Sequence, residues 1–271
     1  MSGARTEKHT EKQKERQAGR TAAGSGTGRP RRTGPADGRV ERGNRTRRLV
    51  LDHTMDVASV EGLEGLSLGR IATELRLSKS GVFALFGSKE ELQLATVRAA
   101  VDVYVAHVVR PARELPPGPE RVWALCRNWL AYSANRVFPG GCFFHGVSAE
   151  FDARGGPVHD AIAEARTEWV SYVERALNAA RRAGGLAADT DVPQVAFEII
   201  ALMEAANAQS VLHGEAVAYQ RAGRAVLRRL RDVATHPGAL PEEPGEIGEI
   251  GEIGEIGEIG GPGEIGGPGT A

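Results

Sequence analysis

The amino-acid sequence predicts an all-α fold with two helical domains between charged tails. Between about residues 44 and 236, apolar residues recur at helical spacing, and no run alternates with the two-residue period of a strand over a useful length. Clusters of Gly and Pro divide this region into segments of helix length. We therefore expect an N-terminal three-helix unit over residues 44–98, followed by a larger helical domain over residues 99–236.

The two ends of the chain have compositions typical of disorder. Residues 1–48 hold 14 Lys and Arg against 5 Asp and Glu, a charge of +9, whereas residues 239–271 hold 8 Glu and no base, a charge of −8. The formal net charge of −1 hides this asymmetry. We expect a disordered basic arm over residues 1–43 and a disordered acidic tail with a Gly-Glu-Ile repeat over residues 237–271. Neither tail has a function that the sequence reveals.

Composition and cysteine content restrict the classes of function. No stretch approaches the ~20 apolar residues of a membrane span, and no apolar run follows the charged N-terminus, so we expect a cytoplasmic protein without a membrane partner. Cys126 and Cys142 lack the spacing of a metal site, which predicts packing residues, no metal and no cofactor. No nucleophile elbow or carboxylate motif is present, and we do not expect an enzyme.

Periodicity and capping residues predict the elements of the N-terminal unit. The first helix, residues 47–60, carries an apolar stripe formed by Leu49, Val50, His53, Met55, Val57 and Ala58. Ser67 caps a short helix, and after a turn at residues 76–78 a second short helix begins at Ser78 or Lys79. Ser88 to Glu91 matches a capping box and starts a long helix. Two short helices joined by such a turn behind an amphipathic helix form a helix-turn-helix.

The second short helix has a face suited to a DNA groove. Its outward residues are small or polar: Lys79, Ser80, Gly81 and Ala84. Its inward side is expected to be anchored by Val82, Phe83 and Phe86. An α-helix enters the ~12 Å major groove only with a small, polar outward face. An ordinary helical hairpin with a solvated face explains the spacing equally well.

The residues themselves resemble a known family. The segment SLGRIATELRLSKSGVFALFGSKEEL, residues 67–92, closely resembles the signature of the tetracycline-repressor (TetR) family, and the resemblance covers residues 45–92. It implies a homodimeric bacterial transcription repressor in which each recognition helix enters a major groove of a palindromic DNA operator. It also implies a helical C-terminal domain that dimerises and binds a small-molecule effector, which releases the operator.

The resemblance assigns DNA contacts residue by residue. The candidates are Arg45, Arg47, Ser67, Arg70, Ser78, Lys79, Ser80, Gly81, Phe83 and Lys89. Arg70 and Lys89 are expected to touch phosphates, which adds affinity more than selectivity. Phe83 and Leu85 stand where the family commonly has Tyr and then His or Tyr, so two phosphate contacts are missing.

Residues 102–236 predict four or five further helices, with Pro119, Pro157 and Pro193 in first turns. The segment PGGCFFHGVSAEFDARGGP, residues 139–157, resembles the effector-domain core of one TetR subgroup. Candidate cavity residues are Trp123, Trp129, Phe143, Phe144, His145 and Met203, with core packing as the alternative for each. By resemblance, the helices after Pro157 and Pro193 build a dimer interface; burial within the monomer is the alternative.

Two other functions remain open. In a helical small-molecule-binding protein, residues 45–92 would only pack, and Lys79 and Arg70 would not affect function. A non-specific DNA-binding protein would use its basic arm and bind all DNA with near-equal affinity. The arm itself either reaches into the minor groove or attracts DNA diffusely.

Overall fold

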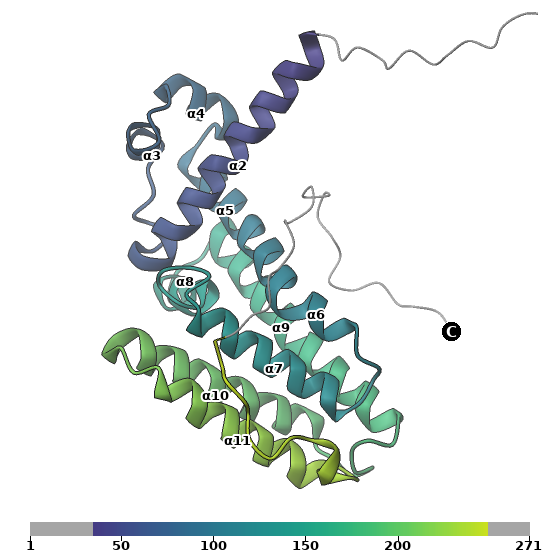
Figure 1. Ribbon diagram of the computed structural model, residues 1–271. Helices are drawn as coiled ribbons and strands as arrows, with labels where there is room; N and C mark the ends of the chain where they lie inside the picture. Colours follow the sequence, from purple (N-terminus) through teal and green to yellow (C-terminus); the bar gives the residue numbers. More distant parts are fainter. Residues whose placement is uncertain (1–34, 249–271) are drawn as a thin grey trace, which may run out of the picture. The chain divides into compact units, whose positions relative to one another are not determined.

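The computed structural model describes residues 35–248, which form a series of helices (Figure 1). These are α2 (Pro35–Glu61), α3 (Leu68–Glu74), α4 (Lys79–Phe86), α5 (Lys89–Tyr104), a π-helical turn η1 (Val105–Val109), α6 (Arg110–Arg113), α7 (Pro119–Ala134), α8 (Phe143–Phe151), α9 (Pro157–Arg182), α10 (Val192–His213), α11 (Val217–Val233) and a 3-10 turn η2 (Pro237–Ala239). No strand occurs in this part of the chain, where one isolated bridge joins Leu186 and Ala234. The predicted all-α class is confirmed.

At the start of four helices, a side-chain oxygen accepts a hydrogen bond from the backbone N–H three residues later. The caps are Ser67 on Arg70 (3.1 Å), Ser78 on Gly81 (3.1 Å), Ser88 on Glu91 (3.0 Å) and Asp191 on Gln194 (3.2 Å). The expected capping box at Ser88 is only half formed, because the N–H of Ser88 donates to the carbonyl of Phe86 at 2.9 Å. Pro119, Pro157 and Pro193 occupy first turns as predicted, where a missing N–H costs nothing.

The first described helix is longer than expected. α2 begins at Pro35 rather than Arg47, so it includes part of the segment expected to be disordered. Val50, Met55 and Ala58 are buried on its apolar stripe, whereas Leu49 is exposed. Residues 1–34, which hold most of the basic arm, lie outside the described residues.

The start of the acidic tail packs against the helices. Leu240 and Pro244 are buried, and Ile247 packs against the core. Gly223 of α11 makes room for them, since a Cβ there would lie 2.8 Å from Cδ1 of Ile247 and 2.9 Å from Cβ of Pro244. The disorder expected from residue 237 is therefore wrong up to residue 248; residues 249–271 lie outside the described part.

Residues 89–113 run as one long helix with a wide turn inside it. Pro111 has no N–H to donate to the carbonyl of His107. The N–H of Arg110 donates instead to the carbonyl of Val105, five residues earlier, which gives the π-helical turn η1.

Two helices are long and apolar enough to cross a membrane, by length and composition alone: Lys89–Arg113 and Val192–His213. The expectation that no stretch meets this condition is therefore wrong. In the first, 61% of the tested window is buried inside the protein, and in the second 44%. Since both helices pack against others in the bundle, they are weak evidence for a membrane span.

α7 packs against α6, η1, α9, α10 and α11, and α10 and α11 lie side by side (Figure 1). A buried polar network fixes these helices. The hydroxyl of Ser133 in α7 donates to Oδ1 of Asn207 in α10 at 2.7 Å and lies 2.8 Å from the hydroxyl of Tyr219 in α11. Oδ1 of Asn207 also accepts from the N–H of Cys142 at 2.9 Å. The start of α8 is thereby tied to α10.

Gly140 allows the loop before α8 to approach α2, and replacing it with alanine tests that approach. A Cβ at Gly140 would lie 1.8 Å from the carbonyl oxygen of Ser59. Gly140→Ala should therefore lower the free energy of unfolding by about 1–3 kcal/mol, measured by urea titration. Gly155→Ala is the control, because nothing lies within 4 Å of its added Cβ. Equal stabilities of the two variants would contradict this packing.

Candidate nucleic-acid interface and ligand cavity

α3 and α4 are joined by a short turn, residues 75–78. Arg76 has φ +55°, a value that side chains other than glycine adopt seldom. The N–H of Leu77 donates to the carbonyl of Ala72 at 2.8 Å, which closes α3 before Ser78 starts α4. Ile71 in α3 and Val82 in α4 are buried. The two short helices therefore share a core and leave one side of α4 open.

The open side of α4 carries small and polar groups. Its exposed residues are Ser78, Lys79, Ser80, Gly81, Phe83 and Ala84. Phe83 is 56% exposed, so its expected role as an inward anchor is wrong, and Val82 and Phe86 anchor the helix without it. Among residues 35–248, Lys79 makes no ion pair. Lys79, Ser80 and Gly81 thus form a convex, accessible surface at the start of α4.

The arginines of α2 differ in accessibility. Arg45 is exposed. Arg47 donates from Nη1 to the carbonyl of Leu85 at 2.9 Å, and its guanidinium lies 4.6 Å from the centre of the Phe86 ring. Such cation–π contacts favour arginine. Arg47 therefore joins α2 to α4.

Arg70 and Lys89, both expected at phosphates, are held by carboxylates. Arg70 pairs with Glu61 and with Glu74, the latter at 2.7 Å, and Lys89 pairs with Glu64 at 2.9 Å. The hydrogen bond from Lys89 lowers the pKa of Glu64, and that from Arg70 lowers the pKa of Glu61. Exposed ion pairs contribute little net free energy, so a phosphate can replace these carboxylates.

α8 is attached to the loop between α2 and α3. The carboxylate of Glu150 accepts from the N–H of Leu63 at 2.7 Å and from that of Glu64 at 2.8 Å. Gly62, with φ +80°, permits this approach, because a Cβ there would lie 2.5 Å from the carboxylate. A second attachment is the N–H of Gly140, which donates to Oγ of Ser59 at 3.0 Å. The helix-turn-helix is therefore bonded to α8 and to the loop before it.

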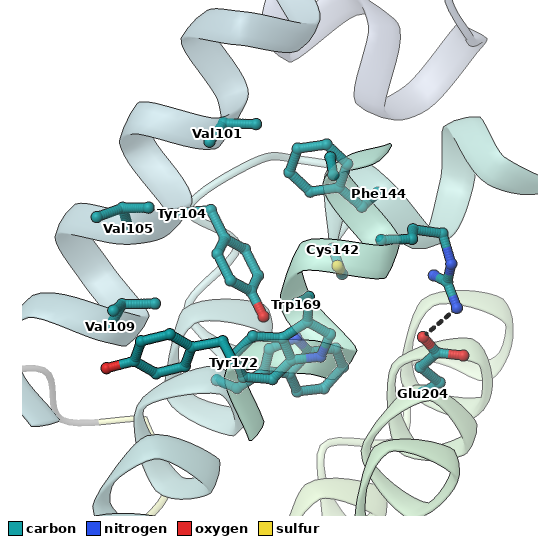
Figure 2. Close-up of a pocket in the computed structure, with 12 residues that line it drawn as sticks. Val101, Tyr104, Val105, Val109, Cys142, Phe144, Trp169, Tyr172 and Glu204 are labelled. Atoms are coloured by element: carbon teal, nitrogen blue, oxygen red, sulfur yellow. Dashed lines mark hydrogen bonds and ion pairs between the residues drawn. The ribbon is translucent and has the colours of Figure 1, made fainter. Parts of the chain in front are cut away.

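A cavity of about 40 Å³ lies among the helices that follow (Figure 2). It is lined by Val101, Tyr104, Val105, Val109, Trp129, Cys142, Phe144, Ala165, Arg166, Trp169, Tyr172 and Glu204. Of the predicted cavity residues, Trp129 and Phe144 line it. Trp123, Phe143 and Met203 are buried in the core but do not line the cavity, and His145 is half-buried elsewhere on α8.

Sequence reasoning missed most of the lining because it comes from several distant segments. Tyr104 and the valines of η1 have no sequence feature that separates them from core residues. Trp169 and Tyr172, spaced i, i+3 beside Arg166 on α9, carried the one usable signal. Ligand pockets are lined mainly by apolar and aromatic side chains with a few polar groups, and this face of α9 carries both kinds.

The polar groups of the cavity are few. Arg166 donates to Glu204 at 2.8 Å (Figure 2). Burial raises the pKa of the Cys142 thiol to about 11 and that of Cys126 to about 12, so both are neutral thiols. Both are buried, as expected of packing residues, and Cys142 also lines the cavity. In the described part of the chain, no three His, Cys, Asp or Glu side chains gather to hold a metal ion.

Two family models match this sequence. One, described as "Bacterial regulatory proteins, tetR family", matches residues 50–96, and the other, "Tetracyclin repressor-like, C-terminal domain", matches residues 118–226. The chain belongs to the tetR family. Among curated proteins, none matches this tetR-family sequence.

Solved structures share the tetR fold of this chain. A TetR transcriptional regulator from Chloroflexus aurantiacus J-10-FL is 20% identical, with 72% of this chain and 98% of that one covered and a TM-score of 0.64. A TetR-family regulator from Streptomyces coelicolor is 24% identical over 75% and 97%, with a TM-score of 0.60. AibR, in complex with isovaleryl coenzyme A and operator DNA, is 18% identical over 73% and 98%, with a TM-score of 0.53.

Ser78 and Ser80 of the tetR helix-turn-helix differ in that only Ser78 caps α4. Both are exposed, but only Ser78 accepts a hydrogen bond from the start of α4. Ser78→Ala should destabilise α4 by about 1 kcal/mol and speed amide hydrogen exchange across residues 79–86. Ser80→Ala serves as the control and should leave exchange unchanged. Matching exchange rates in the two variants would show that the cap does not hold α4.

Proposed function

We propose that this tetR-family regulator is a homodimeric, cytoplasmic repressor that binds a palindromic operator through α4 and leaves it when a small molecule fills the cavity. Residues 44–98 would bind DNA, and residues 99–236 would dimerise and bind the effector. The exposed start of α4 carries this proposal. A helix ~10–12 Å wide with its side chains matches a major groove ~12 Å wide, and small residues allow its backbone to approach the bases.

In this arrangement, Lys79, Ser80 and Gly81 face base edges, and the exposed ring of Phe83 suits a thymine methyl group. Arg45, Ser67 and Ser78 are accessible to phosphates. Arg70 and Lys89 exchange their carboxylate partners for phosphates. Arg47 acts through α4, which it holds by its hydrogen bond to Leu85. The basic arm adds electrostatic attraction that weakens with salt.

The operator is sought in the DNA upstream of the chain's own gene. Fluorescence anisotropy should give binding at least ~10³-fold tighter than to scrambled DNA of equal length. Lys79→Ala should weaken operator binding by about 5- to 150-fold, the effect of about 1–3 kcal/mol, because it removes a cation at the base edges. Arg182→Ala, which removes an exposed cation at the end of α9, is the matched control.

Two outcomes would contradict the proposal. Equal, salt-sensitive affinity for operator and scrambled DNA would favour a non-specific DNA-binding protein. Absence of DNA binding, with Lys79→Ala and Arg70→Ala behaving like the unchanged protein, would favour a small-molecule-binding protein in which the helix-turn-helix only packs.

The homodimer is supported by an apolar stripe on α10. Phe197 and Leu212 are 69% and 78% exposed, and with Ala201, Ala205 and Ala208 they recur at helical spacing along one face. Beside this stripe, α10 and α11 form an open groove. The second helix of the interface is therefore α11 in this proposal, and not α9, which the sequence had paired with α10. Two such pairs form a four-helix bundle about a two-fold axis.

A charge on this stripe should separate the protomers. Phe197→Glu should shift the protein from dimer to monomer in sedimentation analysis at micromolar concentration, because a dimer would bury the carboxylate without a partner. Leu115→Glu is the control, since Leu115 is exposed in the loop after α6. A dimer that persists in Phe197→Glu at all concentrations would place the interface elsewhere.

Effector response is supported by the position of α8. Phe144 lines the cavity near one end of α8, and Glu150 accepts two hydrogen bonds from the helix-turn-helix near the other. A ligand that displaces Phe144 would move Glu150 and the loop at Leu63. A coupling of ~1–3 kcal/mol would lower operator affinity ~5- to 150-fold.

The connection from α8 to the loop at Leu63 is tested by Glu150→Gln. This change preserves the size of the side chain but removes its charge and one of its two acceptor oxygens. Exchange of the Leu63 and Glu64 amide hydrogens should become about tenfold faster or more, because a charge-assisted hydrogen bond contributes ~1.5–3 kcal/mol. Operator affinity should fall as the loop loosens. Glu164→Gln, at an exposed position of α9, should change neither property. Unaltered exchange in Glu150→Gln would remove α8 as the link.

A further inference from the structure

The hydroxyl of Tyr104 is the unusual group of the cavity. It is fully buried, and no hydrogen-bond partner for it occurs within residues 35–248. The ring is fixed by edge-on contacts with Trp169 at 5.2 Å and Phe144 at 5.9 Å between centroids. Figure 2 shows the hydroxyl directed toward Trp169. Because a buried polar group without a partner is costly, this hydroxyl suits a ligand that supplies the hydrogen bond.

The charges of the cavity wall cancel. Arg166 and Glu204 are the two charged residues among those that line it, and they pair with each other at 2.8 Å. Both are partly exposed, so the pair stays hydrated on one side. An anionic ligand would compete with Glu204 for Arg166, and a cationic ligand would compete with Arg166 for Glu204. The wall therefore favours a neutral ligand.

The size and shape of the cavity narrow the class of ligand further. A volume of about 40 Å³ exceeds the ~10–15 Å³ that one water needs but is well below the ~150 Å³ of a cavity that holds benzene, so even a single ring requires the cavity wall to move. The remaining wall is apolar, with the rings of Tyr104, Trp129, Phe144, Trp169 and Tyr172 contributed by α5, α7, α8 and α9. Aromatic rings favour edge-to-face or offset contact with another ring.

We propose that the cavity binds a compact, uncharged, single-ring aromatic compound whose polar group hydrogen-bonds to the hydroxyl of Tyr104. The role of this compound as effector rests on the repressor function proposed above. Its binding in the cavity does not depend on that function. Filling the cavity would press on Phe144 at the start of α8.

Four single-ring probes of similar size test the class of ligand: phenol, toluene, benzoate and benzamidinium. Binding is measured without DNA, by the fluorescence of Trp129 and Trp169 in the cavity wall and by calorimetry. Phenol should bind about tenfold more tightly than toluene, because only phenol can satisfy Tyr104. Benzoate and benzamidinium should bind at least about tenfold more weakly than phenol, because each would bring an unpaired charge into the cavity.

Two variants locate the hydrogen bond. Tyr104→Phe should abolish the preference for phenol over toluene and leave toluene binding unchanged, with thermal stability equal to or above that of the unchanged protein. Tyr132→Phe is the matched control, because the hydroxyl of Tyr132 is also buried but Tyr132 does not line the cavity. The preference should survive in that variant.

The proposal is overturned if phenol and toluene bind equally to the unchanged protein, if the preference persists in Tyr104→Phe, if either ion binds more tightly than phenol, or if none of the four binds. Operator binding by the same preparation separates this result from the repressor proposal. Intact operator binding with failed phenol binding overturns the ligand class alone. Phenol binding that follows the prediction without operator binding overturns the repressor alone.

Discussion

The two hydrogen bonds that the Glu150 carboxylate accepts from backbone N–H groups join parts of the chain that are far apart in sequence. Glu150 lies in α8, and its acceptors hold Leu63 and Glu64, almost ninety residues earlier, in the loop that positions α3. At its other end, α8 begins beside Cys142, whose N–H is held by Asn207 of α10. One nine-residue helix thus contacts the cavity, the helix with the exposed apolar stripe and the helix-turn-helix. A shift of α8 cannot leave the other three unaffected.

α5 provides the second connection between the helix-turn-helix and the cavity, through a continuous helix instead of hydrogen bonds to a loop. It runs without a break across the boundary expected near residues 98 and 99, and buried hydroxyls of Thr54 in α2 and Thr96 in α5 lie 2.9 Å apart. Beyond Tyr104, the π turn forced by Pro111 places Val105 and Val109 in the cavity wall. α5 is therefore one continuous helix that packs in the helix-turn-helix at its start and forms one side of the cavity at its end.

Local features of this fold were predictable, and distant contacts were not. Ser67, Ser78 and Ser88 mark helix starts because a cap acts over three residues, and the sequence displays such spacing directly. The π turn at Pro111 and the burial of Leu240 depend on partners that no local pattern reveals. The same holds for the cavity, where only Trp129 and Phe144 were foreseen, and for Phe83, whose apolar side chain suggests burial but is exposed. Arg70 and Lys89 were expected from their positions, yet the glutamates that hold them became visible only in three dimensions.

The distance between the two α4 helices of a dimer tests the account most directly. Spin labels on Thr73→Cys, at an exposed position of α3 outside the proposed DNA contacts, would report it by double electron–electron resonance, because Cys126 and Cys142 are buried. With operator bound, a single distribution is expected near ~34–36 Å, the spacing of successive major grooves, broadened and offset by the labels. In Glu150→Gln without DNA, the distribution should be broader than in the unchanged sequence without DNA. Absence of any intermolecular distance, or the same distribution in both proteins, would contradict it.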